Sequence, residues 1–253
     1  MLLRALVLLL AFSSARVEAE ESKSEDVVSA LRSAEHHILL AERATTKGQR
    51  GGAVREYRKA CISILGAMQM LSAQAYVHLQ DLQSRRDTRA AARLKTLDTL
   101  SLQAERLLTR SLDGLAASLP AEDIGSELNS LHKQFPKNRT LHERLISDFA
   151  RHRRWADVVA ESERLLQNHR SSKTAHLLQA RANEAQGSNA EAILAYQRAL
   201  EVDDRDSVAY EHVRRLLTTE SRFGEWVAYL ERKARLDPRN AVVQKLLRES
   251  RER

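Results

Sequence analysis

The segment GSNAEAILAYQRALEVDD, residues 187–204, recurs along the chain in altered form. It aligns without gaps with RRWADVVAESERLLQNHR at residues 153–170 and with SRFGEWVAYLERKARLDP at residues 221–238. The starts at 153, 187 and 221 are twice 34 residues apart, and Pro136 continues the series of segment ends at 170, 204 and 238. A fixed period of this length indicates helical units that stack on one another.

Four positions of the middle segment carry a family resemblance. Gly187, Ala192, Tyr196 and Ala199 have the spacing of the glycine, alanine, aromatic residue and alanine in the second helix of tetratricopeptide repeats, which residues 139–240 resemble. The resemblance implies helical hairpins that form a superhelix, in which the first helix of each hairpin lines a concave groove. A single hairpin cannot bury its apolar stripe alone, so stacking is also what the physics of the pattern requires.

The composition favours the same class of fold. The 253 residues include only 8 Gly and 3 Pro, whereas the two types together make up about 12% of an average protein. So few turn residues exclude a β-sandwich, a barrel or a Gly-rich nucleotide-binding fold. We therefore predict an all-α protein, a tetratricopeptide-like α-solenoid preceded by a helical bundle or by degenerate repeats.

Residues 119–253 are predicted to hold the repeat array. An opening helix follows Leu119 and Pro120, with acidic residues in its first turn. Val242, Val243, Leu246 and Leu247 mark a terminal capping helix, whose remaining positions are polar.

Residues 20–118 are predicted to be a separate N-terminal helical region. The expected helices cover residues 26–44, 52–70, 68–83 and 88–117, with a glycine-containing break over 47–52. Gly48, Ala53, Tyr57 and Ala60 repeat the spacing seen from Gly187, which makes residues 34–67 a candidate degenerate repeat. The alternative is a bundle of long helices.

Residues 1–19 have the features of a secretory signal peptide. Arg4 precedes an apolar run over residues 5–12, and Val17 and Ala19 suit a cleavage site before Glu20. The run is shorter than the roughly 20 residues that span a bilayer. We expect the protein in the secretory pathway, either in the endoplasmic reticulum lumen or secreted, or in the periplasm if the host is bacterial. An uncleaved anchor and a mitochondrial presequence are the alternatives, and no membrane span is expected after cleavage.

Motifs for catalysis, cofactors and metals are missing from the sequence. It contains no Gly-x-Gly-x-x-Gly and no phosphate loop, and no second histidine completes a zinc motif after His142 and Glu143. His36 and His37 are adjacent and point to different faces of a helix, and Cys61 lies among apolar residues as a buried, inert thiol. We therefore predict a non-enzymatic protein with no catalytic residues, no cofactor and no metal site.

The charge pattern also limits the class of partner. The formal net charge is +7, but the 41 Lys and Arg residues are interspersed with 34 Asp and Glu residues. Aromatic residues make up only 4% of the chain, which leaves little material for a platform that stacks nucleobases. We expect solvated helix faces and no nucleic-acid partner.

One sequence pattern indicates a covalent modification. Asn138, Arg139 and Thr140 form an N-glycosylation sequon in a predicted turn between helices. Together with a signal peptide, the sequon makes Asn138 a candidate glycosylation site in a eukaryotic host.

The resemblance places nine positions of the first helices along the groove. They are Thr140, Glu143 and Ser147, then Thr174, Leu177 and Arg181, and finally Val208, Glu211 and Arg215. Among them, Leu177, Arg181, Glu211 and Arg215 are the candidate partner-binding residues, because the two arginines lie one period apart and together suit an acidic ligand. The alternative is that these arginines are solvated and pair with Glu184 or Glu211.

These patterns favour a scaffold or adaptor that binds another protein through its groove. The lysine and asparagine that chaperone-binding members of the family use to clamp a C-terminal carboxylate are missing at the matching positions, so no Hsp70 or Hsp90 tail is expected. The alternative function is electrostatic binding of an acidic surface, whether anionic lipid, polysaccharide or nucleic acid.

Overall fold

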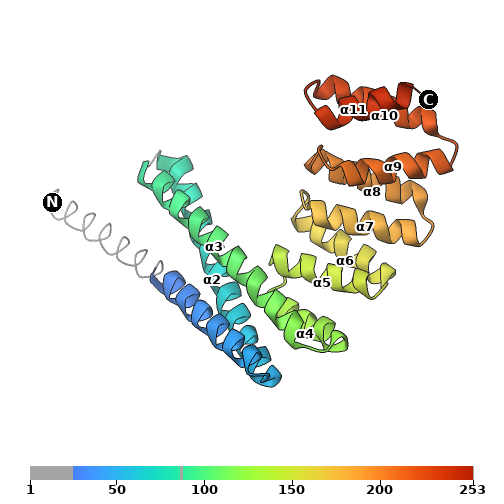
Figure 1. Ribbon diagram of the computed structural model, residues 1–253. Helices are drawn as coiled ribbons and strands as arrows, with labels where there is room; N and C mark the ends of the chain where they lie inside the picture. The colour runs from blue at the N-terminus through green and yellow to red at the C-terminus, as the bar shows by residue number, and fades with distance from the viewer. Residues whose placement is uncertain (1–24, 86–87, 253) are drawn as a thin grey trace, which may run out of the picture. The chain divides into compact units, whose positions relative to one another are not determined.

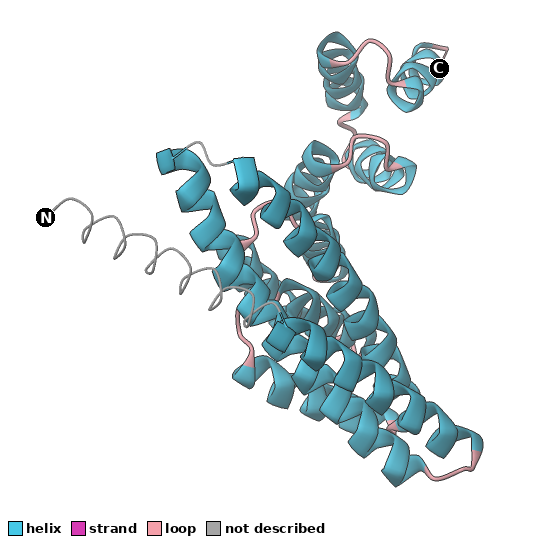
Figure 2. Cartoon of the chain, turned by 90° about the vertical axis from the view of Figure 1, so that its left-hand side faces the viewer, coloured by secondary structure: helices cyan, strands magenta, loops and turns pink. Residues whose placement is uncertain are grey.

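The computed structural model describes residues 25–85 and 88–252. The predicted signal peptide, residues 1–19, lies outside this part of the chain. Every regular element in the described residues is a helix, as Figure 2 shows, and the all-α prediction is confirmed. The chain divides into two compact units, one ending at Glu127 and one beginning at Leu128.

The first unit contains three long helices, shown from blue to green in Figure 1. The first covers residues 25–46, α2 covers Arg50–Arg85, and α3 covers Thr88–Ser118 and packs along α2. The helices predicted over 52–70 and 68–83 are one continuous helix, and the predicted break is confined to residues 47–49. This part of the chain therefore has long bundle helices, with no hairpin of repeat length in the described residues.

Apolar and small residues form the core of this unit. Cys61 is completely buried, as predicted, and burial raises the pKa of its thiol to about 12. The ring of Tyr57 lies directly over Gly114, so closely that a Cβ at position 114 would overlap it. This close approach between α2 and α3 explains why glycine is needed inside a long helix, where it otherwise costs about 1 kcal/mol.

One described segment is long and apolar enough to cross a membrane by length and composition. It is Arg50–Gln80 within α2, and 33% of its most apolar window is buried inside the protein. Core helices of bundles pass the same test, and Leu65 and Leu71 of this segment are buried. The absence of a membrane span after the signal peptide stays a prediction.

The second unit is an array of helical hairpins, in which helices of 13 and 14 residues alternate up to α10 and a helix of 11 residues follows. It begins in α4 (Ala121–Gln134) and continues with α5 (Arg139–Arg151), α6 (Trp155–Asn168), α7 (Lys173–Ala185), α8 (Asn189–Val202), α9 (Ser207–Thr219), α10 (Phe223–Leu236) and α11 (Ala241–Arg251). Successive helices pack on one another from α5 to α11, and α5 also contacts α7 (Figure 1). The predicted helical-hairpin α-solenoid is confirmed.

The 34-residue period recurs in the helix caps. The first helices of the three hairpins and the terminal helix α11 begin after Asn138, Ser172, Asp206 and Asn240, and each of these side chains accepts a hydrogen bond from a backbone N–H of the first turn. An N-cap of this kind satisfies a donor that the helix cannot pair internally and contributes about 1 kcal/mol.

The period also appears in the backbone of the turn within each hairpin. Arg153, Gly187 and Ser221 have φ angles of 56°, 79° and 59°, in the left-handed region. Glycine adopts this conformation readily, whereas a residue with a side chain is strained there. Each hairpin therefore uses the same turn, although only one of the three carries the residue that suits it.

The core of the array lies between the two layers of helices. Ala192, Tyr196 and Ala199, which carry the family resemblance, are all buried. Trp226 occupies the slot of Ala192 in the last hairpin, is completely buried, and donates a hydrogen bond from Nε1 to Ser250 Oγ of α11 at 2.9 Å. The terminal helix thus covers the core at this end of the array.

Candidate binding groove and a histidine cluster

The nine groove positions lie on α5, α7 and α9, the first helices of the three hairpins. All nine are at least partly exposed, whereas neighbouring positions of the same helices, such as Leu145, Ala180 and Val213, are buried. Val208 is the most prominent apolar member, with 57% of its surface exposed. The first helices therefore present one mixed polar and apolar face to solvent.

Arg215 is held by a polar cluster that joins two hairpins. Its guanidinium forms an ion pair with Glu184 of α7. The same carboxylate accepts a hydrogen bond at 3.1 Å from Tyr196 Oη and lies 3.1 Å from His212 Nδ1, and the rings of Tyr196 and His212 stack with centroids 4.7 Å apart. The cluster links α7, α8 and α9 below the groove face.

These partners shift the acidity of the carboxyl group. Burial acts to raise the pKa of Glu184, but hydrogen bonds from Arg215 and Tyr196 and the nearby positive charge outweigh it, so the pKa lies below its usual value. Glu184 is therefore ionised at neutral pH and neutralises Arg215.

The remaining candidate residues have different surroundings. Glu211 pairs with Arg214 of its own helix at 2.7 Å, and Leu177 packs partly against the core. Arg181 is exposed, and no hydrogen bond or ion pair of its side chain occurs within the described residues. Of the two arginines, Arg215 thus pairs as the alternative interpretation expected, while Arg181 remains available to a ligand.

The sequon asparagine has a structural role. Asn138 precedes α5 and accepts a hydrogen bond from the backbone N–H of Leu141 through its side-chain oxygen at 2.9 Å. The capping role accounts for an asparagine here independently of any glycan. Glycosylation of Asn138 stays a prediction.

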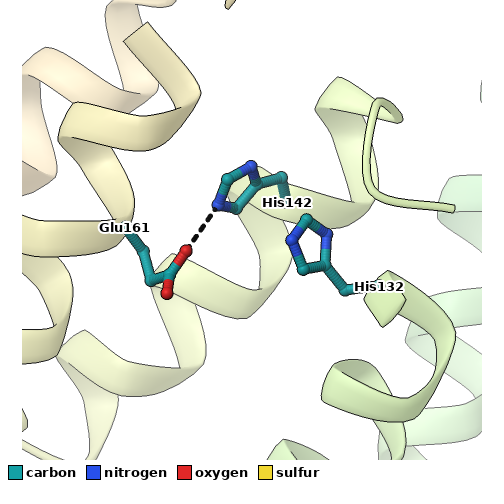
Figure 3. Close-up of side chains that lie close together, drawn as sticks. All are labelled: His132, His142 and Glu161. Atoms are coloured by element: carbon teal, nitrogen blue, oxygen red, sulfur yellow. Dashed lines mark hydrogen bonds and ion pairs between the residues drawn. The ribbon is translucent and has the colours of Figure 1, made fainter. Parts of the chain in front are cut away.

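A second polar cluster, unlike anything expected from sequence motifs, lies at the start of the array. Figure 3 shows His132 of α4, His142 of α5 and Glu161 of α6 with their side chains converging. His142 Nε2 lies 3.1 Å from Glu161 Oε2, and the two imidazole rings have centroids 4.2 Å apart. One ligand atom from each residue lies within 4.8 Å of the others. We call these three residues the histidine cluster.

Most of the cluster is shielded from solvent. The side chain of His142 is 7% exposed and that of Glu161 is 18% exposed. His132 Nδ1 is buried and has no hydrogen-bond partner. Burial and the neighbouring His142 lower the pKa of His132, which is therefore a neutral imidazole with an available lone pair at neutral pH.

Similarity to known proteins is limited to solved structures with low sequence identity. No protein-family model matches the sequence, and no curated protein matches it. Among solved structures, the MamA protein is 14% identical with a TM-score of 0.49, over 83% of this chain and 94% of that chain. A thermophilic TPR protein of Thermus thermophilus is 11% identical with a TM-score of 0.41, over 86% and 98%. The pilF protein of Pseudomonas aeruginosa is 15% identical with a TM-score of 0.41, over 87% and 99%.

Proposed function

We propose that the protein is a non-enzymatic scaffold or adaptor that binds a partner protein or peptide through the groove face of α5, α7 and α9. The compartment we propose is the secretory pathway, or the periplasm in a bacterial host. The observation that carries the proposal is that all nine groove positions are partly or fully exposed, whereas adjoining positions of the same helices, such as Leu145, Ala180 and Val213, are buried. A regular exposed face on consecutive helices gives an extended ligand repeated contacts at fixed spacing.

The available positive charge on this face suits an acidic segment of the partner. Arg181 offers an unneutralised guanidinium, and exposed Val208 offers apolar contact one hairpin further along. A guanidinium forms bidentate hydrogen bonds with carboxylates, which gives orientation as well as affinity.

Affinity capture from the native host tests this function with a charge-matched control. The groove variant is Arg181→Glu with Arg215→Gln, and the control is Arg198→Glu with Arg232→Gln, which lie one period apart on α8 and α10 in the other layer of helices. We expect one protein partner that the control retains and the groove variant loses, while circular dichroism shows both variants folded. Equal capture by both variants would contradict binding through the groove.

The salt dependence of the captured material separates the scaffold from an electrostatic binder. Binding that depends on released counterions falls by orders of magnitude between low and moderate salt, whereas a packed groove responds weakly. Recovery of heterogeneous acidic material that is removed by moderate salt would favour the electrostatic alternative.

A further inference from the structure

The histidine cluster interrupts a packing arrangement that the rest of the array repeats. One period further along, the corresponding positions hold Leu166, His176 and Ala195, and after another period they hold Leu200, Tyr210 and Tyr229. In the last set all three residues belong to one apolar core, and the two tyrosine rings have centroids 6.2 Å apart. The same junction between three helices thus holds a leucine and two tyrosines, whose hydroxyl groups are also buried without a partner, at one end of the array, and two imidazoles and a carboxylate at the other.

This replacement is costly unless the polar atoms find partners. A buried donor or acceptor without a hydrogen bond costs about 1–3 kcal/mol, and His132 Nδ1 is such an atom. The contact between His142 and Glu161 satisfies one atom of each, but it leaves the ring of His132 tilted against that of His142 without a hydrogen bond to either residue. A ligand that accepts all three side chains would account for their joint presence.

We propose that His132, His142 and Glu161 bind a divalent transition-metal ion of the zinc class. Two imidazole nitrogens and one carboxylate oxygen form a donor set that zinc uses with a fourth position left to water or another ligand. None of these three residues is among the nine groove positions, and the proposed metal site does not depend on the proposed function.

The distances are compatible with coordination. Zinc–nitrogen and zinc–oxygen bonds of about 2.0–2.2 Å place neighbouring ligand atoms of a tetrahedron about 3.4 Å apart. The separation of 3.1 Å between His142 Nε2 and Glu161 Oε2 is already close to this value. The largest separation in the cluster, at most 4.8 Å, closes by side-chain rotation of His132 in the last turn of α4.

Arg164 orients the carboxylate for this role. It lies one turn after Glu161 on α6 and donates a hydrogen bond from Nη1 to Glu161 Oε1 at 2.5 Å. This contact occupies one carboxylate oxygen and leaves Oε2 directed at His142, as Figure 3 shows. Outer groups that orient a ligand in this way commonly raise metal affinity.

The test is a titration of the full-length, chelator-treated protein with Zn²⁺ alone. Calorimetry measures the binding, and the melting temperature is compared with and without the metal. The array itself supplies the substitutions: His132→Leu copies Leu166 and Leu200, His142→Tyr copies Tyr210, and Glu161→Ala copies Ala195. Because those residues already pack at this junction elsewhere, we expect the variants to stay folded. His36→Gln, in the first unit, is the matched control for the loss of one exposed histidine.

We expect the wild-type protein to bind one equivalent of Zn²⁺ with micromolar or tighter affinity and to melt at a higher temperature with the metal. Each cluster variant should lose at least tenfold in affinity, and His36→Gln should match the wild type. A second readout avoids variants altogether: Co²⁺ bound by the wild-type protein should show visible absorption that one equivalent of Zn²⁺ removes. No saturable binding by the wild type, or unchanged binding by the three cluster variants, would overturn the proposal.

Discussion

The left-handed turn shared by the three hairpins makes a quantitative prediction for Gly187. Its φ of 79° suits glycine, and a Cβ built there meets no atom within 4 Å, so Gly187→Ala changes the backbone energy alone. The left-handed conformation costs an alanine roughly 1–2 kcal/mol, while the reduced freedom of the unfolded chain returns about 0.4–1 kcal/mol. We expect a net loss of about 1 kcal/mol in the free energy of unfolding.

Ser221, whose φ is 59°, should respond to substitution in the opposite direction. Ser221→Gly relieves the backbone strain of the folded protein but gives the unfolded chain more freedom. We expect the free energy of unfolding to rise by about 0.5–1 kcal/mol. Gly224 supplies the control, because it also has open space around its Cβ position but lies inside α10 with no left-handed φ. Gly224→Ala should therefore stabilise the protein.

Urea titrations monitored by tryptophan fluorescence measure these changes in the free energy of unfolding of the second unit. Both tryptophans, Trp155 and Trp226, lie in the second unit, so their emission reports its unfolding. A change of about 1 kcal/mol shifts the midpoint by roughly 0.5 M urea. Gly187→Ala that stabilises as much as Gly224→Ala would refute the argument from backbone strain.

Three further predictions concern single groups. Cys61 should resist thiol reagents at pH 8 and react only on unfolding, since burial raises its pKa to about 12; rapid labelling of the native protein would contradict this. Gly114→Ala should lower the free energy of unfolding by about 1–3 kcal/mol, measured by helical circular dichroism, because its methyl group overlaps Tyr57. Because the pKa of Glu184 is lowered in the folded protein, its ionised form contributes to the free energy of unfolding above its usual pKa of 4.5. This contribution is lost as the pH falls through the lower pKa of the folded protein. Arg215→Gln should therefore reduce the loss of stability on acidification below about pH 5, and an identical pH profile in the variant would argue against the ion pair.

The repeat array could be predicted because its information is local and periodic. Apolar stripes with helical spacing, the small residues Ala192 and Ala199, and turn residues at a fixed interval all lie within single hairpins. The cap series that runs from Asn138 to Asn240 was not predicted, although it has the same 34-residue spacing, and it explains an asparagine that sequence motifs alone assign to glycosylation.

The first unit was harder to predict because tertiary packing overrides local signals there. Gly51, Gly52 and Gly66 favour breaks by propensity, yet all three lie inside α2. A helix of 36 residues gains enough contact with its neighbours to tolerate them. The structural need for Gly114 also arises from a distant residue, which no local pattern contains.

The histidine cluster was missed for a related reason. Motif searches compare residues a few positions apart, whereas His132, His142 and Glu161 come from three helices and meet only in the folded array. The signal that could have found them is a comparison across the 34-residue period, in which two histidines and a glutamate stand in place of Leu200, Tyr210 and Tyr229.

Photo-crosslinking in the native host tests whether α5, α7 and α9 form the binding face. A photoreactive residue replaces Val208 on α9, which is 57% exposed, or Leu194 on α8, which is 47% exposed and lies in the other layer of helices. The groove account predicts a defined crosslinked protein from position 208 and none from position 194. A defined partner at position 194 alone would contradict it.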